Sequence, residues 1–223
     1  MSFAFLAILV AQAYTLSNKK ISVSIDNNGN LSSLKNLQTG HEYASGGYLW
    51  RMYYDTKQEK EIQIVGNEQQ PLVTQHGNCI EIKYDQLKAR GKDLYFTLIL
   101  TVKLEDDKVR FESTMTNNEE NSIIREFQYP LVHGIKFPAD HQLYTSEAGG
   151  KLYKDPIASV NVLAASPYKK PEQYFRQKDV KYGARVFMNC IGLFGKNQGL
   201  YFGSHDDTFQ DTWHGMRVYR DKD

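Results

Sequence analysis

Apolar and polar residues alternate with a period of two along most of the chain. In the clearest case, apolar side chains occupy every second position from Leu94 to Leu104. After the acidic turn 105–107, the alternation resumes from Val109 to Met115. A period of two is typical of a strand with one buried face. The pattern therefore predicts a long antiparallel hairpin with one side in the core.

Shorter runs with the same period, or rich in aromatic residues, predict further strands. Turn-forming residues separate many of them, as in Asn27-Asn28-Gly29-Asn30, which favours a tight hairpin turn. Residues 40–47 are expected to form a loop. The remaining strands are expected at residues 21–26, 31–37, 48–54, 61–65, 72–75, 79–84, 123–129, 134–137, 141–144, 185–194, 200–202 and 213–219.

The alternation breaks down between Thr145 and Gly183. Gly149-Gly150 and three prolines interrupt a polar stretch that is rich in Tyr and Lys. One weak helical turn near residues 172–178 is the only regular structure expected there. A loop of this length inside a compact domain is usually functional or packs against another domain.

About a dozen strands with almost no helix predict an all-β protein. We expect residues 14–223 to form one domain, a large antiparallel β-sandwich. Residues 1–13 are set apart, because the apolar run 3–10 is followed by Ala11-Gln12-Ala13, a small-x-small cleavage pattern. This resembles a truncated secretory signal peptide without its basic n-region and predicts a secreted or periplasmic protein. The alternative is a buried first strand or helix.

Charge and composition narrow the classes of partner. The net charge is +1, from 27 basic and 26 acidic residues, and no basic run or stripe is present. Nucleic acid is therefore not an expected partner. No apolar segment reaches the ~18 residues of a membrane span. Cys79 and Cys190 both lie in apolar, strand-like segments, so two buried thiols and one disulfide both stay open.

Three segments carry a resemblance to a known family: 49–52 (Leu-Trp-Arg-Met), the hairpin 96–115, and 199–206 (Gly-Leu-Tyr-Phe-Gly-Ser-His-Asp). Together they resemble the N-terminal β-sandwich of multi-domain glycoside hydrolases, which has the galactose-mutarotase-like supersandwich fold. The resemblance implies a non-catalytic module that supports a catalytic (β/α)8 barrel and contributes to carbohydrate binding. Such a barrel needs ~200 further residues and is not among these 223. The missing barrel domain and a carbohydrate are thus the partners that the resemblance implies.

The densest group of polar, ligand-capable residues follows the last glycine of this motif. It comprises His205, Asp206, Asp207, Asp211 and His214, with Trp213 beside them. Asp and His can hydrogen-bond sugar hydroxyls next to an aromatic platform, so we expect carbohydrate or interdomain contact at His205, Asp206, Asp207, Trp213 and His214. Calcium is an alternative ligand, although no established metal-ligand spacing is matched. The simplest alternative is a turn in which Asp caps backbone N–H groups.

Two other functions stay open. An aldose mutarotase or epimerase needs a general acid and a general base, for which His133, His141 and Glu147 are available without a distinguishing spacing. A stand-alone carbohydrate-binding module is the third reading. For Trp50 we expect packing in the core rather than a sugar platform.

Overall fold

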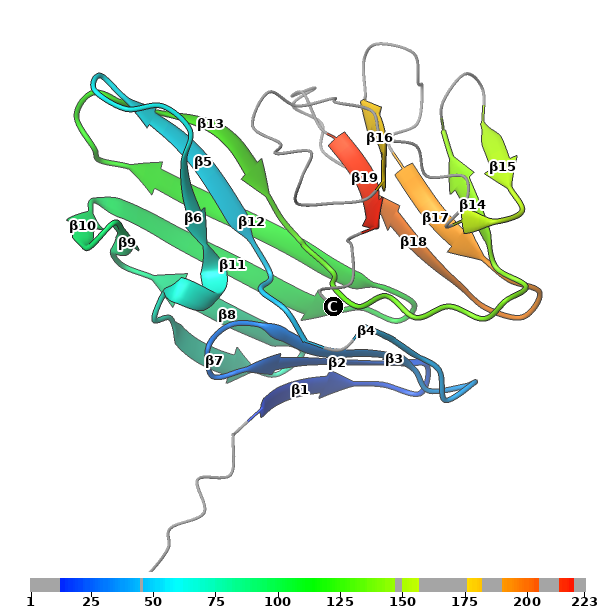
Figure 1. Ribbon diagram of the computed structural model, residues 1–223. Helices are drawn as coiled ribbons and strands as arrows, with labels where there is room; N and C mark the ends of the chain where they lie inside the picture. Colours follow the sequence, from blue (N-terminus) through cyan, green and yellow to red (C-terminus); the bar gives the residue numbers. More distant parts are fainter. Residues whose placement is uncertain are drawn as a thin grey trace, which may run out of the picture. The chain divides into compact units, whose positions relative to one another are not determined.

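The computed structural model describes residues 13–44, 46–146, 150–156, 176–181, 190–204 and 213–218 (Figure 1). Within these ranges every strand pairing is antiparallel, and helical assignment is limited to the short 3-10 turn η1 (Gly66–Glu68) and to Pro156. The predicted all-β class is confirmed. The chain divides into two compact units, Met1–Lys136 and Phe137–Asp223, which are described separately.

Unit 1 contains four antiparallel sheets. The first has the order β1-β2-β3-β4, with β1 (Ala13–Ser17), β2 (Ile21–Asp26), β3 (Leu31–Asn36) and β4 (Glu42–Ala44). The second has the order β12-β11-β8-β7, with β7 (Leu72–His76), β8 (Cys79–Tyr84), β11 (Phe96–Leu104) and β12 (Val109–Asn117). The third has the order β13-β5-β6, with β5 (Arg51–Thr56), β6 (Ile62–Val65) and β13 (Ser122–Gln128). The short pair β9 (Leu87–Ala89) and β10 (Lys92–Leu94) forms the fourth.

The core of unit 1 lies where the β5 sheet packs on the β11 sheet. Every second residue of β11 is buried, as the alternation predicted. Two edge-to-face ring contacts join the sheets: Tyr54 with Phe96 at 5.6 Å, and Trp50 with Tyr84 at 5.2 Å between ring centroids. Trp50 is fully buried, so its expected place in the core is confirmed.

Unit 2 contains two sheets. One has the order β15-β14-β17-β18, with β14 (Gln142–Thr145), β15 (Lys151–Tyr153), β17 (Cys190–Phe194) and β18 (Gly199–Gly203). The other pairs β16 (Arg176–Lys181) with β19 (Trp213–Val218). Leu143, Ile191 and Leu193 are buried in the first sheet.

Several local predictions are wrong. The expected loop 40–47 contains β4, and the expected strand 134–137 has no strand assignment, although Lys136 N–H donates to the Tyr43 carbonyl. Residues 176–178, in the expected helical turn, belong to β16, and β15 lies in the expected long loop. β16 forms because β19, more than 30 residues away, supplies its hydrogen bonds, which local pattern cannot reveal.

The position of the first strand, β1, is relevant to the signal peptide predicted for residues 1–13. β1 begins at Ala13, pairs with β2, and buries Leu16, although the sequence pattern gave no strand there. Residues 1–12 lie outside the described ranges, so the signal peptide stays a prediction, as does the single domain 14–223. Among the described residues, no helix has the length and apolar character of a transmembrane span.

Candidate functional site

The polar turn predicted from the sequence is described only in part. His205, Asp206, Asp207 and Asp211 lie outside the described residues. For Trp213 and His214 the structure gives the backbone, which opens β19 opposite Lys181 and Val180 of β16. Carbohydrate or interdomain contact at this turn therefore stays a prediction.

A second polar region lies on β5, on the face turned away from the core. Met52 and Tyr54 share the inner face with the β11 sheet, so the alternating residues Arg51, Tyr53 and Asp55 belong to the outer face. These three residues are nevertheless only 7%, 5% and 4% exposed. Buried charged side chains need hydrogen-bonding partners, and the neighbouring strand β13 supplies most of them.

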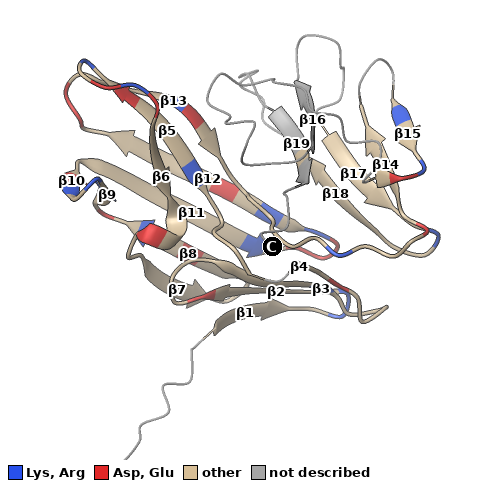
Figure 2. Cartoon of the chain, viewed as in Figure 1, with Lys and Arg blue, Asp and Glu red and all other residues tan. Residues whose placement is uncertain are grey.

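An irregularity in β13 brings these partners to the outer face. The register between β13 and β5 shifts between Ile124 and Glu126, with Arg125 at the shift. Beyond the shift, Glu126 lies opposite Tyr53, and Gln128 lies opposite Arg51. Charged residues of both signs are interspersed along β12 and β13 (Figure 2). A bulge of this kind redirects side chains and is a common device near functional sites.

At one end of β5, Asp55 holds a loop in place. Its carboxylate accepts hydrogen bonds from the Glu61 backbone N–H at 2.9 Å and from Arg125 Nε at 2.8 Å, and it pairs with Lys60 at 3.3 Å. The Glu61 N–H bond is the largest cause that lowers the pKa of Asp55, and Arg125 and Lys60 lower it further. Glu61 has a positive φ of 57°. Asp55 is thus a satisfied structural group that fixes a strained loop residue.

At the other end, Arg51 forms a polar chain with Gln128 and Glu126. Arg51 Nε and Nη2 donate to Gln128 Oε1 at 3.0 and 2.5 Å, and the guanidinium lies 5.3 Å from the centre of the Tyr53 ring. The Gln128 amide donates in turn to Glu126 Oε1. Arg51 forms no ion pair with a carboxylate in the part of the chain that the structure describes. Its charge is balanced indirectly, through the amide of Gln128.

His133 lies near enough to Arg51 for the guanidinium charge to act on its ring. Its ring contacts the ring of Tyr48, with 4.5 Å between centroids, and donates a hydrogen bond to the Tyr48 backbone carbonyl. Gly47 makes room for it, because a Cβ there would lie 2.5 Å from the imidazole. Burial lowers the pKa of His133, and the charge of Arg51 lowers it further, against the opposing effect of the Tyr48 bond. His133 Nε2 is buried and has no hydrogen-bond partner among the described residues.

We name Tyr48, Arg51, Glu126, Gln128 and His133 the β5–β13 site. It combines an aromatic ring, a guanidinium, an amide, a carboxylate and a neutral imidazole on one end of a rigid sheet. Guanidinium, amide and carboxylate groups can hydrogen-bond hydroxyls, and a neutral imidazole nitrogen can accept a proton, although His133 Nε2 itself is buried. Sequence reasoning singled out His133 but missed the polar chain. Its signal was a charged residue, Arg51, in the middle of an otherwise aromatic and apolar run.

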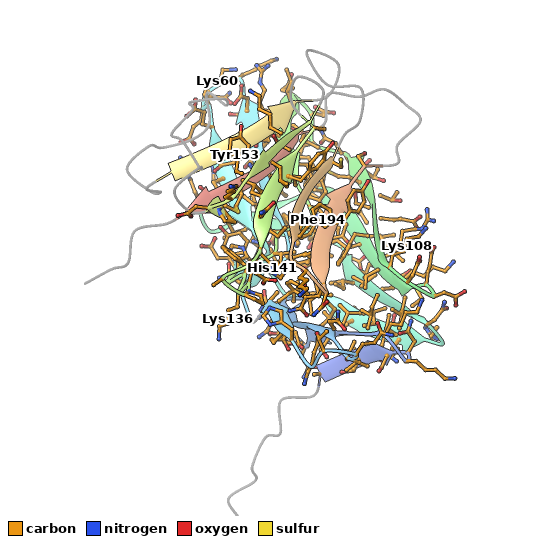
Figure 3. The ribbon with its side chains drawn as sticks, turned by 90° about the vertical axis from the view of Figure 1, so that its right-hand side faces the viewer. Lys60, Lys108, Lys136, His141, Tyr153 and Phe194 are labelled. Atoms are coloured by element: carbon orange, nitrogen blue, oxygen red, sulfur yellow. The ribbon has the colours of Figure 1, made fainter. Side chains whose placement is uncertain are left out.

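The other acid–base candidates lie in unit 2. His141 is 1% exposed at the start of β14 (Figure 3), with Nδ1 3.3 Å from Asp140 Oδ1. Asp140 also accepts the Lys196 backbone N–H, which is the largest cause that lowers its pKa. This arrangement fixes the turn between β17 and β18. Glu147 lies outside the described residues.

Neither cysteine forms a disulfide in the described part of the chain. Cys190 is buried in β17, where its carbonyl accepts a hydrogen bond from Ser146 at 3.1 Å, and burial raises the pKa of its thiol. Within the described ranges, no three His, Cys, Asp or Glu side chains converge as metal ligands. The calcium alternative concerns a turn outside these ranges and stays untested.

Comparison with known proteins adds no family assignment: no family model matches the chain, and no curated protein sequence matches it.

Proposed function

We propose that the chain is a β-supersandwich module of an exported carbohydrate-processing enzyme, which contacts sugar hydroxyls and supports a separate catalytic domain. The observation that carries the proposal is the β5–β13 site. A buried guanidinium, an amide and a carboxylate form one hydrogen-bonded chain there, and His133, which contacts the Tyr48 ring, has an Nε2 without a hydrogen-bond partner among the described residues. Planar polar groups beside an aromatic face are the chemistry that recognises a sugar ring.

The resemblance of segments 49–52, 96–115 and 199–206 to glycoside hydrolase sandwich modules supports the same proposal. Arg51 belongs to the first of these segments, and β11 and β12 form the second. Two antiparallel sheets packed face to face in unit 1 are compatible with the larger supersandwich. The polar turn 205–207 with Trp213 and His214 would be a second contact region under this proposal.

Glycan affinity electrophoresis tests the sugar contact. The chain is run through gels that contain soluble polysaccharides, and retardation is compared for His133→Ala, Glu126→Gln and a matched control. Gln63→Ala is that control. Gln63 is exposed and lies opposite Tyr53 on β6, the strand that pairs with β5 along the edge away from β13. We expect retardation to fall in the first two variants and to persist in the control. Absence of retardation by every polysaccharide, or equal retardation of all variants, would overturn the proposal.

Trp213→Ala separates the two contact regions. If Trp213→Ala loses retardation and His133→Ala keeps it, the sugar contact is assigned to the predicted polar turn. Retention in Trp213→Ala with loss in His133→Ala would assign it to the β5–β13 site.

The second candidate function is an aldose mutarotase or epimerase. The specific observation in its favour is the lowered pKa of His133 together with its Nε2, which has no hydrogen-bond partner in the described part of the chain and suits a general base. Polarimetry of freshly dissolved sugar anomers tests this function directly. Interconversion that is faster than the buffer reaction, and lost in His133→Ala, would establish catalysis. A stand-alone carbohydrate-binding module would show retardation without interconversion and without a catalytic domain encoded alongside.

A further inference from the structure

A groove in unit 1 lies apart from the β5–β13 site and shares no residue with it. It runs between β1 and the turn from β7 to β8, with a volume of about 340 Å³, and is open to solvent on one side. β1 belongs to a different sheet from β7 and β8, and all three strands lie in the lower part of unit 1 in Figure 1. The lining residues are Thr15, Leu16, Ser17, Gln75, Gly77, Asn78 and Leu104.

The lining divides into an apolar floor and a polar rim. Leu16 and Leu104 are 2% and 6% exposed and form the floor. The rim residues are all uncharged and exposed. The space beside Gly77 is open, because a Cβ at this residue would contact nothing within 4 Å. A groove with an apolar base and neutral hydrogen-bonding edges suits a ligand with one apolar face and many hydroxyls.

The two amides on the rim are held in fixed orientations. Gln75 Nε2 donates to the Thr15 backbone carbonyl at 3.2 Å, and Asn78 Nδ2 donates to the Leu104 backbone carbonyl at 2.9 Å. Each amide nitrogen is therefore directed toward the protein. The carbonyl oxygens Gln75 Oε1 and Asn78 Oδ1 accept no hydrogen bond from the described residues. Two pre-oriented acceptors on one wall of a groove reduce the entropy cost of binding hydroxyl donors.

The groove walls are also fixed to one another. Asn18, which follows β1, donates to the carbonyls of Glu105 and Asp106 after β11, at 2.9 and 3.3 Å. Together with the Gln75 bond to β1, this joins the first sheet to the β11 sheet at two points near the groove. Its shape is therefore set by the fold rather than by the ligand.

We propose that this groove binds an uncharged, hydroxyl-rich ligand, such as one or two rings of a neutral sugar. The class follows from the lining itself: no charged side chain lines the groove, so an ionic ligand would lose its hydration without gaining an ion pair. The inference stands independently of the β5–β13 site. If both sites bind carbohydrate, the module contacts it at two separate places.

Titration of the isotope-labelled chain with lactose, cellobiose and maltose, followed by two-dimensional NMR, tests the groove. We expect saturable shifts of the side-chain amide signals of Gln75 and Asn78 and of the Gly77 backbone signal, with dissociation constants on the order of 1 mM. Because the ligand is neutral, the constants should not change between low and high salt. Glycerol serves as the control for non-specific contact of hydroxyl groups.

Variants distinguish the groove from the rest of the molecule. Gln75→Ala should weaken binding about tenfold, because the fixed acceptor is lost. Gln63→Ala, a similarly exposed strand glutamine, should leave it unchanged. Ser17→Tyr should block the groove without altering either amide. His133→Ala should leave the groove shifts intact even if it abolishes binding at the β5–β13 site.

Three results would overturn the inference: no saturable shift with any of the three sugars, the same shifts with glycerol, or unchanged binding in both Gln75→Ala and Ser17→Tyr.

Discussion

The central strands β11 and β5 face each other across the core of unit 1 but differ in how they are buried. In β11, one face is apolar and buried, and the other carries Thr97, Ile99 and Thr101, which are only half-buried. In β5, five consecutive residues are buried, and the outer face holds Arg51, Tyr53 and Asp55. β11 is stabilised by apolar area removed from water. The outer face of β5 depends instead on hydrogen bonds that satisfy buried charges.

This difference separates the face of unit 1 that mainly provides stability from the face that is suited to recognition. A face held by apolar contact tolerates exchange among side chains of similar volume. A face held by a polar chain loses a defined donor or acceptor with each substitution. The polar face of β5 is accordingly the more specific of the two and the better place for recognition.

The largest effect is expected in the apolar face of β11. Leu100→Ala should lower the free energy of unfolding by about 2–5 kcal/mol, because it leaves a cavity in a fully buried layer. Ile99→Ala, the next residue on the half-buried face, is the matched control and should cost much less. Urea denaturation of both variants measures the difference. Equal losses would show that the two faces of β11 are not distinct.

The next effect is expected at Arg51. Arg51→Met should lower the free energy of unfolding by about 1–3 kcal/mol, because Gln128 Oε1 loses the Nε and Nη2 donors of Arg51. Arg110→Met is the control, since exposed Arg110 pairs with Glu105 at the surface and should leave the urea midpoint almost unchanged. A stability loss in Arg51→Met no larger than in the control would contradict a structural role for the polar chain.

A smaller effect separates two glycines with positive φ. Gly47→Ala should cost about 1–2 kcal/mol more than Gly40→Ala, because a Cβ at Gly47 meets the His133 ring and a Cβ at Gly40 meets nothing. Both substitutions carry the same kind of backbone strain, with φ of 95° and 73°. The double variant Gly47→Ala/His133→Ala should recover most of the excess. If thermal unfolding shows no excess destabilisation in Gly47→Ala, or no recovery in the double variant, the close packing of Gly47 against His133 is contradicted.

The smallest effect is a dependence on pH. The folded-state pKa of His133 lies below its unfolded value of about 6.5, so the unfolded chain binds the proton more readily. The contribution of His133 is therefore complete above pH 6.5 and is lost as the pH falls through 6.5 toward the folded pKa. We expect Tm to drop less between pH 7.5 and pH 5 in His133→Asn than in the unchanged chain. Parallel pH profiles would contradict this assignment.

Local pattern predicted the strands whose partners are near in sequence. β2, β8 and the β11–β12 hairpin follow from alternation and turn residues, and Trp50 was expected in the core. β16 was not predicted, because its partner strand, β19, lies more than 30 residues away in the sequence. β4 was missed for a different reason: it is three residues long, and short edge strands have little pattern of their own.

The candidate sites divide in the same way. The sequence by itself determined the all-β class, the sidedness of β11 and the presence of polar residues that can bind a ligand, because these follow from composition and a period of two. Only the tertiary structure decided which polar residues meet. The bulge in β13 places Glu126 and Gln128 beside Arg51, and the approach of β1 to β7 fixes the amide of Gln75. The physical reason is that strand register and sheet packing join residues far apart in the sequence, such as Arg51 with Gln128 and Thr15 with Gln75, and nothing in either local segment specifies its distant partner.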